Sequence, residues 1–296
     1  MLSDLDVSIE ADRPAMGTVS MPVAYGLALS GSLVGEELRS LLPVDGGPWP
    51  QVKLDWEPKA MASANEVMDD DRASLRCLFG GNLLADRMAM SATFCNAPCP
   101  DPHVLAHPGL AGVALVFARW LGRSAFHGGA VLSDQGAWGV VGAKGRGKTT
   151  TLAALALNGH DVLADDMVVL DGSAALTGPR TLDLRPSAAE HMDGDFTVVT
   201  VRGGERRRLV LGSTVISAPF RGWIFLGSAP QVTVERIPPA ERLAALAEHL
   251  AVRLMPRDPV AFLELASLPA YRVGRPLSWD TLPAVISAIQ EVIGKP

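Results

Sequence analysis

The sequence predicts an α/β fold, in which a mixed sheet flanked by helices is preceded by a smaller β-rich N-terminal subdomain. Three observations carry this prediction. Apolar and polar residues alternate in the first third of the chain, as at 23–31 and 51–56, which is typical of strands. Near the middle, a glycine-rich loop at 142–149 stands between an apolar strand and a helix-forming run. Helical spacing of apolar residues dominates the C-terminal part.

The N-terminal subdomain is expected to cover residues 1–105. Turn-forming residues separate its strands, as at 44–50, and the acidic stretch 62–72 is expected to be a solvated loop or a helix end. A proline-rich run at 96–102 interrupts regular structure, so the boundary is placed there. We expect this subdomain to contribute to substrate recognition.

The second domain is expected to cover residues 106–296 and to hold the glycine loop. Its first part is predicted as a helix over 108–121, two strands around the turn 134–136, and a helix that follows the loop and stops at Asn158-Gly159. A strand or strand pair surrounds the next acidic residues. The remaining elements are predicted as strands at 208–211, 222–226 and 231–236, and as helices at 239–255, 259–268 and 282–293.

Composition and charge exclude several classes of protein. The chain has 296 residues, of which 48% are hydrophobic and 20% charged, as in globular proteins. The net charge of −6 argues against a duplex nucleic-acid binder, and the longest apolar stretch, 109–118, is too short to span a membrane. The first ten residues lack the basic region of a secretory signal, and three cysteines do not make a disulfide framework. We therefore expect a cytoplasmic protein without nucleic-acid or membrane partners.

The glycine loop fits the pattern G-x-x-x-x-G-K-[ST]. Glycines allow the backbone to wrap around an oxyanion, and the N-terminus of the following helix adds a favourable dipole. Only five of the 26 basic residues are lysines, yet two of them lie in this loop. A nucleoside triphosphate is expected to contact Gly142, Ala143, Lys144, Gly145, Arg146, Gly147, Lys148, Thr149 and Thr150.

Two adjacent carboxylates follow an apolar run soon after this loop. Asp165 and Asp166 come after Val162-Leu163-Ala164, and Asp166 lies 18 positions after Lys148. At the end of a strand, two such groups can divide their tasks, one binding Mg²⁺ and the other contacting an attacking hydroxyl. A plain acidic turn is the alternative. His127, beside two glycines, begins the strand that precedes the strand of the glycine loop.

These segments resemble a known family. AFHGGAVL (125–132) and GVVGAKGRGKTTTLAALALNGHDVLADDMVVL (139–170) are similar to the kinase core of HPr kinase/phosphorylase and its HPr-kinase-related relatives. Weaker similarity extends to relatives from peptide-modifying gene neighbourhoods, among them lasso-peptide kinases, which phosphorylate a serine of a precursor peptide. The resemblance implies a P-loop kinase core of the HPr kinase type that uses ATP and Mg²⁺.

The resemblance also implies roles for individual residues. Lys148 and the loop amides would bind the phosphates, Thr149 and Asp166 would hold Mg²⁺, Asp165 would be the general base, and His127 would lie close to the γ-phosphate. Arg185 and the cluster Arg206-Arg207-Arg208 are candidates for charge stabilisation or for binding an acidic peptide. A solvated cationic face is the alternative for these arginines.

The predicted function is transfer of the γ-phosphate of ATP to a serine or threonine hydroxyl of a peptide or protein, in particular a precursor peptide in ribosomal natural-product biosynthesis. A kinase for a small-molecule hydroxyl and a nucleotide-dependent peptide-delivery module remain alternatives. The chain lacks the glycine-rich signature that the family ties to HPr and to the reverse phosphorylase reaction. The sequence therefore predicts neither HPr as the partner nor the reverse reaction. The sequence also leaves open whether the nucleotide is ATP or GTP and whether the protein forms a homo-oligomer.

A second set of potential ligands lies at the predicted domain boundary. Cys95, Cys99, His103 and His107 follow one another at equal spacing, and Zn²⁺ accepts four ligands of these types. Free thiols and a histidine at a helix start are the alternative.

Overall fold

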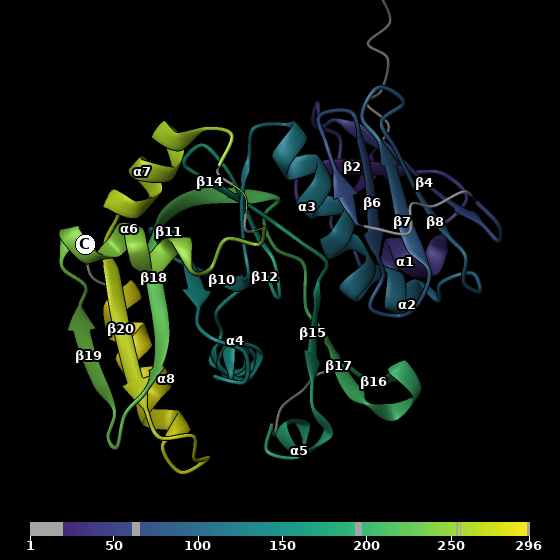
Figure 1. Cartoon of the computed structure of the whole chain (residues 1–296). Helices are drawn as coiled ribbons and strands as arrows, with labels where there is room; N and C mark the ends of the chain where they lie inside the picture. The colour runs from purple at the N-terminus through teal and green to yellow at the C-terminus, as the bar shows by residue number, and fades with distance from the viewer. Residues whose placement is uncertain (1–19, 61–65, 193–196, 253, 255, 295–296) are drawn as a thin grey trace, which may run out of the picture.

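The computed structural model describes residues 20–60, 66–192, 197–252, 254 and 256–294 (Figure 1). Over these residues the chain is a mixed α/β protein, as predicted, and its strands form three sheets. No helix of this part of the chain is long and apolar enough to cross a membrane.

The first sheet has eight strands in the order β3-β1-β2-β4-β8-β7-β6-β5 and forms the purple and blue part of Figure 1. β4 runs parallel to both of its neighbours, whereas the other pairs are antiparallel. The predicted strand at 51–56 is present. The stretch predicted as a strand at 23–31 instead forms two antiparallel strands, because the chain turns at Tyr25-Gly26, where both φ values are positive. The strands are β1 (Met21–Ala24), β2 (Leu27–Ser30), β3 (Val44–Asp45), β4 (Gln51–Glu57), β5 (Val67–Met68), β6 (Arg72–Arg76), β7 (Asn82–Asp86) and β8 (Ser91–Cys95).

Three helical segments accompany this sheet. α1 (Glu36–Ser40) and α2 (Pro102–Val104) are short, and a π-helical turn at Leu105–Gly109 leads into α3 (Leu110–Trp120). The helix predicted over 108–121 is thus confirmed in its main part, and it packs against β7. The stretch 62–72, expected to be a solvated loop or a helix end, instead holds β5 and the start of β6, while its residues 62–65 lie outside the described residues.

The second sheet follows the order β12-β10-β11-β18-β14-β13-β9, and β20 joins β18 to β19. β11, β18 and β20 are parallel, so their carboxyl ends share one edge of the sheet. The strands are β9 (Ser124–Phe126), β10 (Gly128–Ser133), β11 (Gly136–Val141), β12 (Val162–Ala164), β13 (Val168–Asp171), β14 (Ala174–Leu176), β18 (Ser217–Ser228), β19 (Thr233–Arg236) and β20 (Ala270–Arg275).

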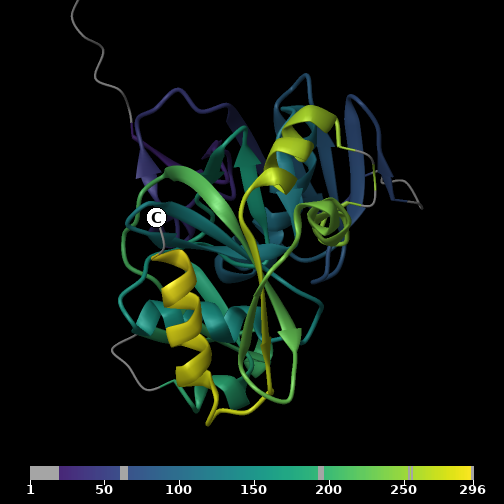
Figure 2. The same cartoon turned by 90° about the vertical axis from the view of Figure 1, so that its left-hand side faces the viewer.

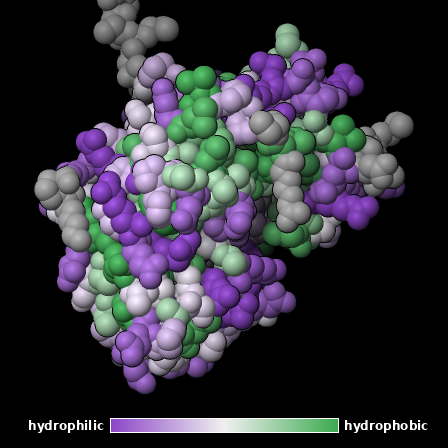
Figure 3. Space-filling view, turned by 60° about the vertical axis from the view of Figure 1, so that its left-hand side comes forward, coloured by the Kyte–Doolittle hydropathy of each residue, from purple (hydrophilic) through white to green (hydrophobic). Residues whose placement is uncertain are grey.

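Helices lie along this sheet, and β11 is buried on both faces. Ala137 and Val141 belong to an apolar core shared with α3 and the first sheet, whereas Trp138 and Val140 belong to a second core with α4 (Lys148–Leu157) and α8 (Leu282–Ile293). α6 (Pro239–Ala247) and α7 (Pro259–Ser267) pack against each other, as the views in Figures 1 and 2 show. On the face drawn in Figure 3, polar and apolar residues are interspersed.

The helix predicted over 239–255 is wrong in its second half. α6 ends at Ala247, and the chain then turns back to pair with the edge of the second sheet. Leu250 forms a bridge with Phe126, and the amide of Ala251 donates to the carbonyl of Ala125 at 3.0 Å. These main-chain bonds to β9 replace the helical ones.

A third sheet of three strands, β15-β17-β16, extends from the second one (Figure 1). Its strands are β15 (Thr181–Leu184), β16 (Thr197–Val201) and β17 (Arg206–Val210), and α5 (Pro186–Ala189) follows β15. β15 packs beside α4, so this sheet borders the helix that follows the glycine loop.

Candidate functional site

The glycine loop connects the buried strand β11 to α4, which is the local structure that the motif predicts. Gly145 and Gly147 have φ values of +83° and +75°, a region that glycine enters without steric cost. α4 begins at Lys148, so the first amides of the helix lack intrahelical partners and can bind an anion.

The side chain of Lys148 folds over this loop. Its Nζ donates to the carbonyl of Gly142 at 2.8 Å. Burial lowers the pKa of Lys148, whereas the nearby carboxylates of Asp165 and Asp166 act in the opposite direction. A phosphate group would offer this ammonium a charged acceptor, which makes a stronger hydrogen bond than a carbonyl does.

Asp165 lies at the end of β12 and faces the first turn of α4. Its Oδ1 accepts a hydrogen bond of 3.2 Å from the hydroxyl of Thr149. The residue is 7% exposed, and burial, together with the neighbouring charge of Asp166, raises its pKa from 3.8 to about 7. A carboxyl group with such a pKa can accept a proton near neutral pH.

Asp166 points toward a different partner. Its backbone adopts a φ of +66°, which is uncommon for a residue with a side chain. Nδ1 of His127 lies 3.0 Å from its carbonyl oxygen and 3.4 Å from its Oδ1. His127 stands between β9 and β10, where its amide donates to the carbonyl of His249 at 2.8 Å. The two acids therefore face Thr149 and His127 respectively.

Arg275 is a residue of this site that the sequence did not single out. It is the last residue of β20 and is 3% exposed. Its Nη2 donates to the carbonyl of Arg146 at 2.9 Å, and therefore directly to the glycine loop. Its place beside the loop depends on the parallel pairing of β20 with β18, which the local sequence does not show.

The arginine cluster 206–208 is not one cationic face. Arg208 is fully buried, and its guanidinium makes a bidentate contact with Asp183, with distances of 2.6 and 2.8 Å. Arg202, in the turn after β16, lies 3.3 Å from the same carboxylate. Arg206 and Arg207 are partly exposed, and Arg185 is exposed at the residue before α5.

The proposed zinc ligands do not form a metal centre. Cys95 ends β8, Cys99 is exposed, and Nε2 of His103 lies 3.2 Å from a carboxylate oxygen of Glu37. In the described ranges, no three Cys, His, Asp or Glu side chains are placed to hold one ion. Mg²⁺ makes no such demand, since it keeps waters and substrate phosphates beside one or two protein ligands.

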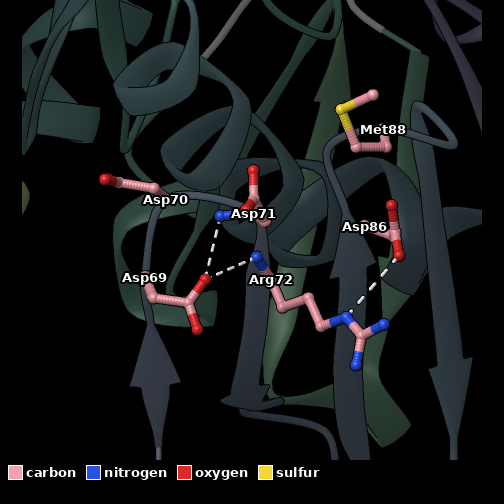
Figure 4. Close-up of a pocket in the computed structure, with 6 residues that line it drawn as sticks. All are labelled: Asp69, Asp70, Asp71, Arg72, Asp86 and Met88. Atoms are coloured by element: carbon pink, nitrogen blue, oxygen red, sulfur yellow. Dashed lines mark hydrogen bonds and ion pairs between the residues drawn. The ribbon is translucent and has the colours of Figure 1, made fainter.

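A cavity of about 770 Å³ lies elsewhere, at the first sheet (Figure 4). The side chain of Asp69 there accepts from the amides of Asp71 and Arg72 at 2.9 and 2.7 Å. The cavity contains none of the predicted site residues. Its lining residues are Asp69, Asp70, Asp71, Arg72, Asp86 and Met88.

Comparison with known proteins gives a distant similarity to solved structures. No family model and no curated protein sequence matches the chain. Among solved structures, the chain is similar to the Hpr(Ser) kinase/phosphatase from Coxiella burnetii, with 12% sequence identity and a TM-score of 0.27. The matched region covers 57% of this chain and 96% of the other.

Proposed function

We propose that this protein is a Mg²⁺- and ATP-dependent kinase that transfers the γ-phosphate to a serine or threonine hydroxyl of a peptide or protein. One observation carries the proposal. At the end of the glycine loop, Thr149 follows Lys148, and its hydroxyl contacts the buried carboxylate of Asp165. A phosphate cradle, a cationic side chain, a metal-binding hydroxyl and a carboxylate are the parts that phosphoryl transfer uses.

In this proposal Lys148 and the loop amides bind the phosphates, and Thr149 and Asp166 hold Mg²⁺. Asp165 accepts the proton of the attacking hydroxyl. The oxygen of that hydroxyl forms a bond to the γ-phosphorus, while the bond between the γ-phosphorus and the β–γ bridging oxygen breaks. ADP leaves with that bridging oxygen. The raised pKa of Asp165 supports its role as a base near neutral pH. His127, beside Asp166, would lie on the γ-phosphate side.

The contact between Thr149 and Asp165 supports a second assignment of the two carboxylates. In it, Asp165 shares Mg²⁺ with Thr149, and Asp166 acts as the base with His127. Loss of a base lowers kcat without changing the Mg²⁺ concentration needed for half-maximal rate, whereas loss of a metal ligand raises that concentration. Asp165→Asn and Asp166→Asn, compared in a Mg²⁺ titration of the rate, therefore distinguish the two assignments.

A peptide acceptor is supported by the weaker resemblance of segments 23–31, 105–129, 180–192 and 268–276 to relatives from peptide-modifying gene neighbourhoods. We assign recognition of this acceptor to the N-terminal part, residues 1–105, with residues 106–296 as the kinase domain. A precursor peptide of ribosomal natural-product biosynthesis is the substrate class that follows from the same resemblance.

The test is incubation of the protein with ATP, Mg²⁺ and serine- or threonine-containing peptides, followed by mass spectrometry. Products heavier by one phosphate are expected with the wild type and should fall by at least about 100-fold in Asp165→Asn, the range that loss of a general base produces. Asp161→Asn is a matched control, because this exposed carboxylate precedes the same strand. Undiminished transfer in Asp165→Asn would contradict the proposed base, and transfer to no hydroxyl acceptor would contradict the kinase function.

A further inference from the structure

The guanidinium of Arg275 forms hydrogen bonds with the glycine loop and with the first turn of α4. Its Nη2 lies 2.9 Å from the carbonyl oxygen of Arg146, 3.4 Å from that of Gly147 and 3.3 Å from the hydroxyl oxygen of Thr151. Thr151 is itself fully buried and donates through its hydroxyl to the carbonyl of Gly147 at 2.9 Å. One guanidinium nitrogen thus joins the end of the loop to the first turn of α4.

This guanidinium is buried without an acidic partner. In the described part of the chain, no carboxylate lies within ion-pair distance of Arg275, and burial lowers the pKa of its side chain. Its Nε is also buried and has no hydrogen-bond partner. The contrast with Arg208, which meets Asp183 in a bidentate pair, is direct. An arginine keeps its charge in proteins, and an unpaired buried charge is costly, so the site gains from an anion nearby.

The contacts of Arg275 also fix the orientation of two loop amides. A peptide unit is planar and trans, so its N–H and C=O groups point in opposite directions. Because the carbonyls of Arg146 and Gly147 face Arg275, the amides of Gly147 and Lys148 face away from it. Successive amides that converge in this way form an anion-binding nest.

We propose that Arg275 is a positioning residue of the phosphate site: it holds the peptide units that follow Arg146 and Gly147 so that their amides face the nucleotide phosphates, and it supplies a fixed positive charge behind the loop. The inference rests on the proposed function, since it takes the bound anion to be a nucleoside triphosphate. A lysine replaces this arginine only in part, because it keeps the charge but lacks the planar fork.

The test compares the full-length wild type with Arg275→Met, Arg275→Lys and the control Arg272→Met, which removes an exposed arginine of the same strand. Calorimetric titration with ATP is carried out at low and at high salt, and urea unfolding without nucleotide confirms that each variant is folded. Arg275→Met should weaken ATP binding by at least about 10-fold at low salt, as expected for loss of charge-assisted hydrogen bonds. The loss should be smaller at high salt, because salt weakens the attraction between the Arg275 charge and the ATP phosphates in the wild type, so that less remains to be lost.

Arg275→Lys should show an intermediate dissociation constant with the salt dependence of the wild type, and Arg272→Met should bind as the wild type does. If Arg275→Met is unfolded, the intermediate affinity of Arg275→Lys carries the test. ATP binding by Arg275→Met equal to that of the wild type would overturn the role proposed for Arg275 and leave the proposed kinase function untouched. So would an equal loss at both salt concentrations with no recovery in Arg275→Lys, since that pattern describes packing only. A wild type that binds no ATP would instead overturn the proposed function.

Discussion

Replacement of Asp165 by asparagine should stabilise the nucleotide-free protein at high pH. Asp165 is almost completely buried, and its pKa is raised from 3.8 to about 7. Between these two pH values the native protein holds a proton that the unfolded chain has released. Stability therefore falls as the pH rises through this window.

The size of the effect follows from the shift. At 1.36 kcal/mol per pKa unit, a shift from 3.8 to about 7 corresponds to a loss of about 4 kcal/mol in the free energy of unfolding. Asparagine has nearly the same shape and can still accept the hydrogen bond of Thr149, but it carries no titrating group. The free energy of unfolding of Asp165→Asn minus that of the wild type should therefore be near zero at about pH 4 and should rise to about 4 kcal/mol at about pH 8.

Urea unfolding of both proteins across this pH range, without Mg²⁺ or nucleotide, measures the difference directly. Asp161→Asn serves as the control, because its carboxylate is exposed and its replacement should not reproduce the pH-dependent gain. A difference between Asp165→Asn and the wild type that does not change with pH would refute the reasoning. So would a variant that is less stable than the wild type at high pH.

Two further predictions concern the loop and its first helical turn. Thr149→Val removes the hydroxyl that contacts Asp165 and should raise the Mg²⁺ concentration needed for half-maximal phosphoryl transfer by at least about 10-fold, as a metal titration of the rate would show. Unchanged Mg²⁺ dependence would exclude this hydroxyl as a ligand. Gly147→Ala places a Cβ against the guanidinium of Arg275 at a φ of +75°, and should lower the free energy of unfolding by more than the ~1–2 kcal/mol that the left-handed conformation alone costs. Gly159→Ala, at a φ of +84° in open space, should show only that conformational cost in the same urea experiment, and equal losses in the two variants would contradict the collision.

The sequence predicted the part of the site that is local in the chain. The strand, the glycine loop and the helix over 137–157 follow from one motif, and the apolar run 162–164 placed Asp165 at a strand end. The direction in which each acid points was not predictable, because it depends on the positive φ of Asp166 and on the position of His127.

Other features depend on residues that are far apart in the sequence. Arg208 appeared to belong to an exposed cluster because nothing in the sequence shows that Asp183 lies opposite it, in register on the neighbouring strand β15. The contact of Arg275 with Arg146 likewise arises from the sheet, where β20 ends beside the loop. The helix predicted to reach residue 255 stops at Ala247 because the next residues bond to the edge strand β9 instead. In each case, tertiary pairing determined what the local pattern left open.

The most direct measurement of the central claim is a calorimetric titration of the protein with MgATP, compared between the wild type, Lys148→Ala and Lys144→Ala. Nζ of Lys148 lies over the glycine loop, against the carbonyl of Gly142, and would bind the phosphates. Lys144 is an exposed residue of the same loop. We predict binding by the wild type and by Lys144→Ala, and no detectable binding by a folded Lys148→Ala. Equal binding by Lys148→Ala and the wild type, or no binding by the wild type, would contradict the assignment of this loop as the nucleotide site.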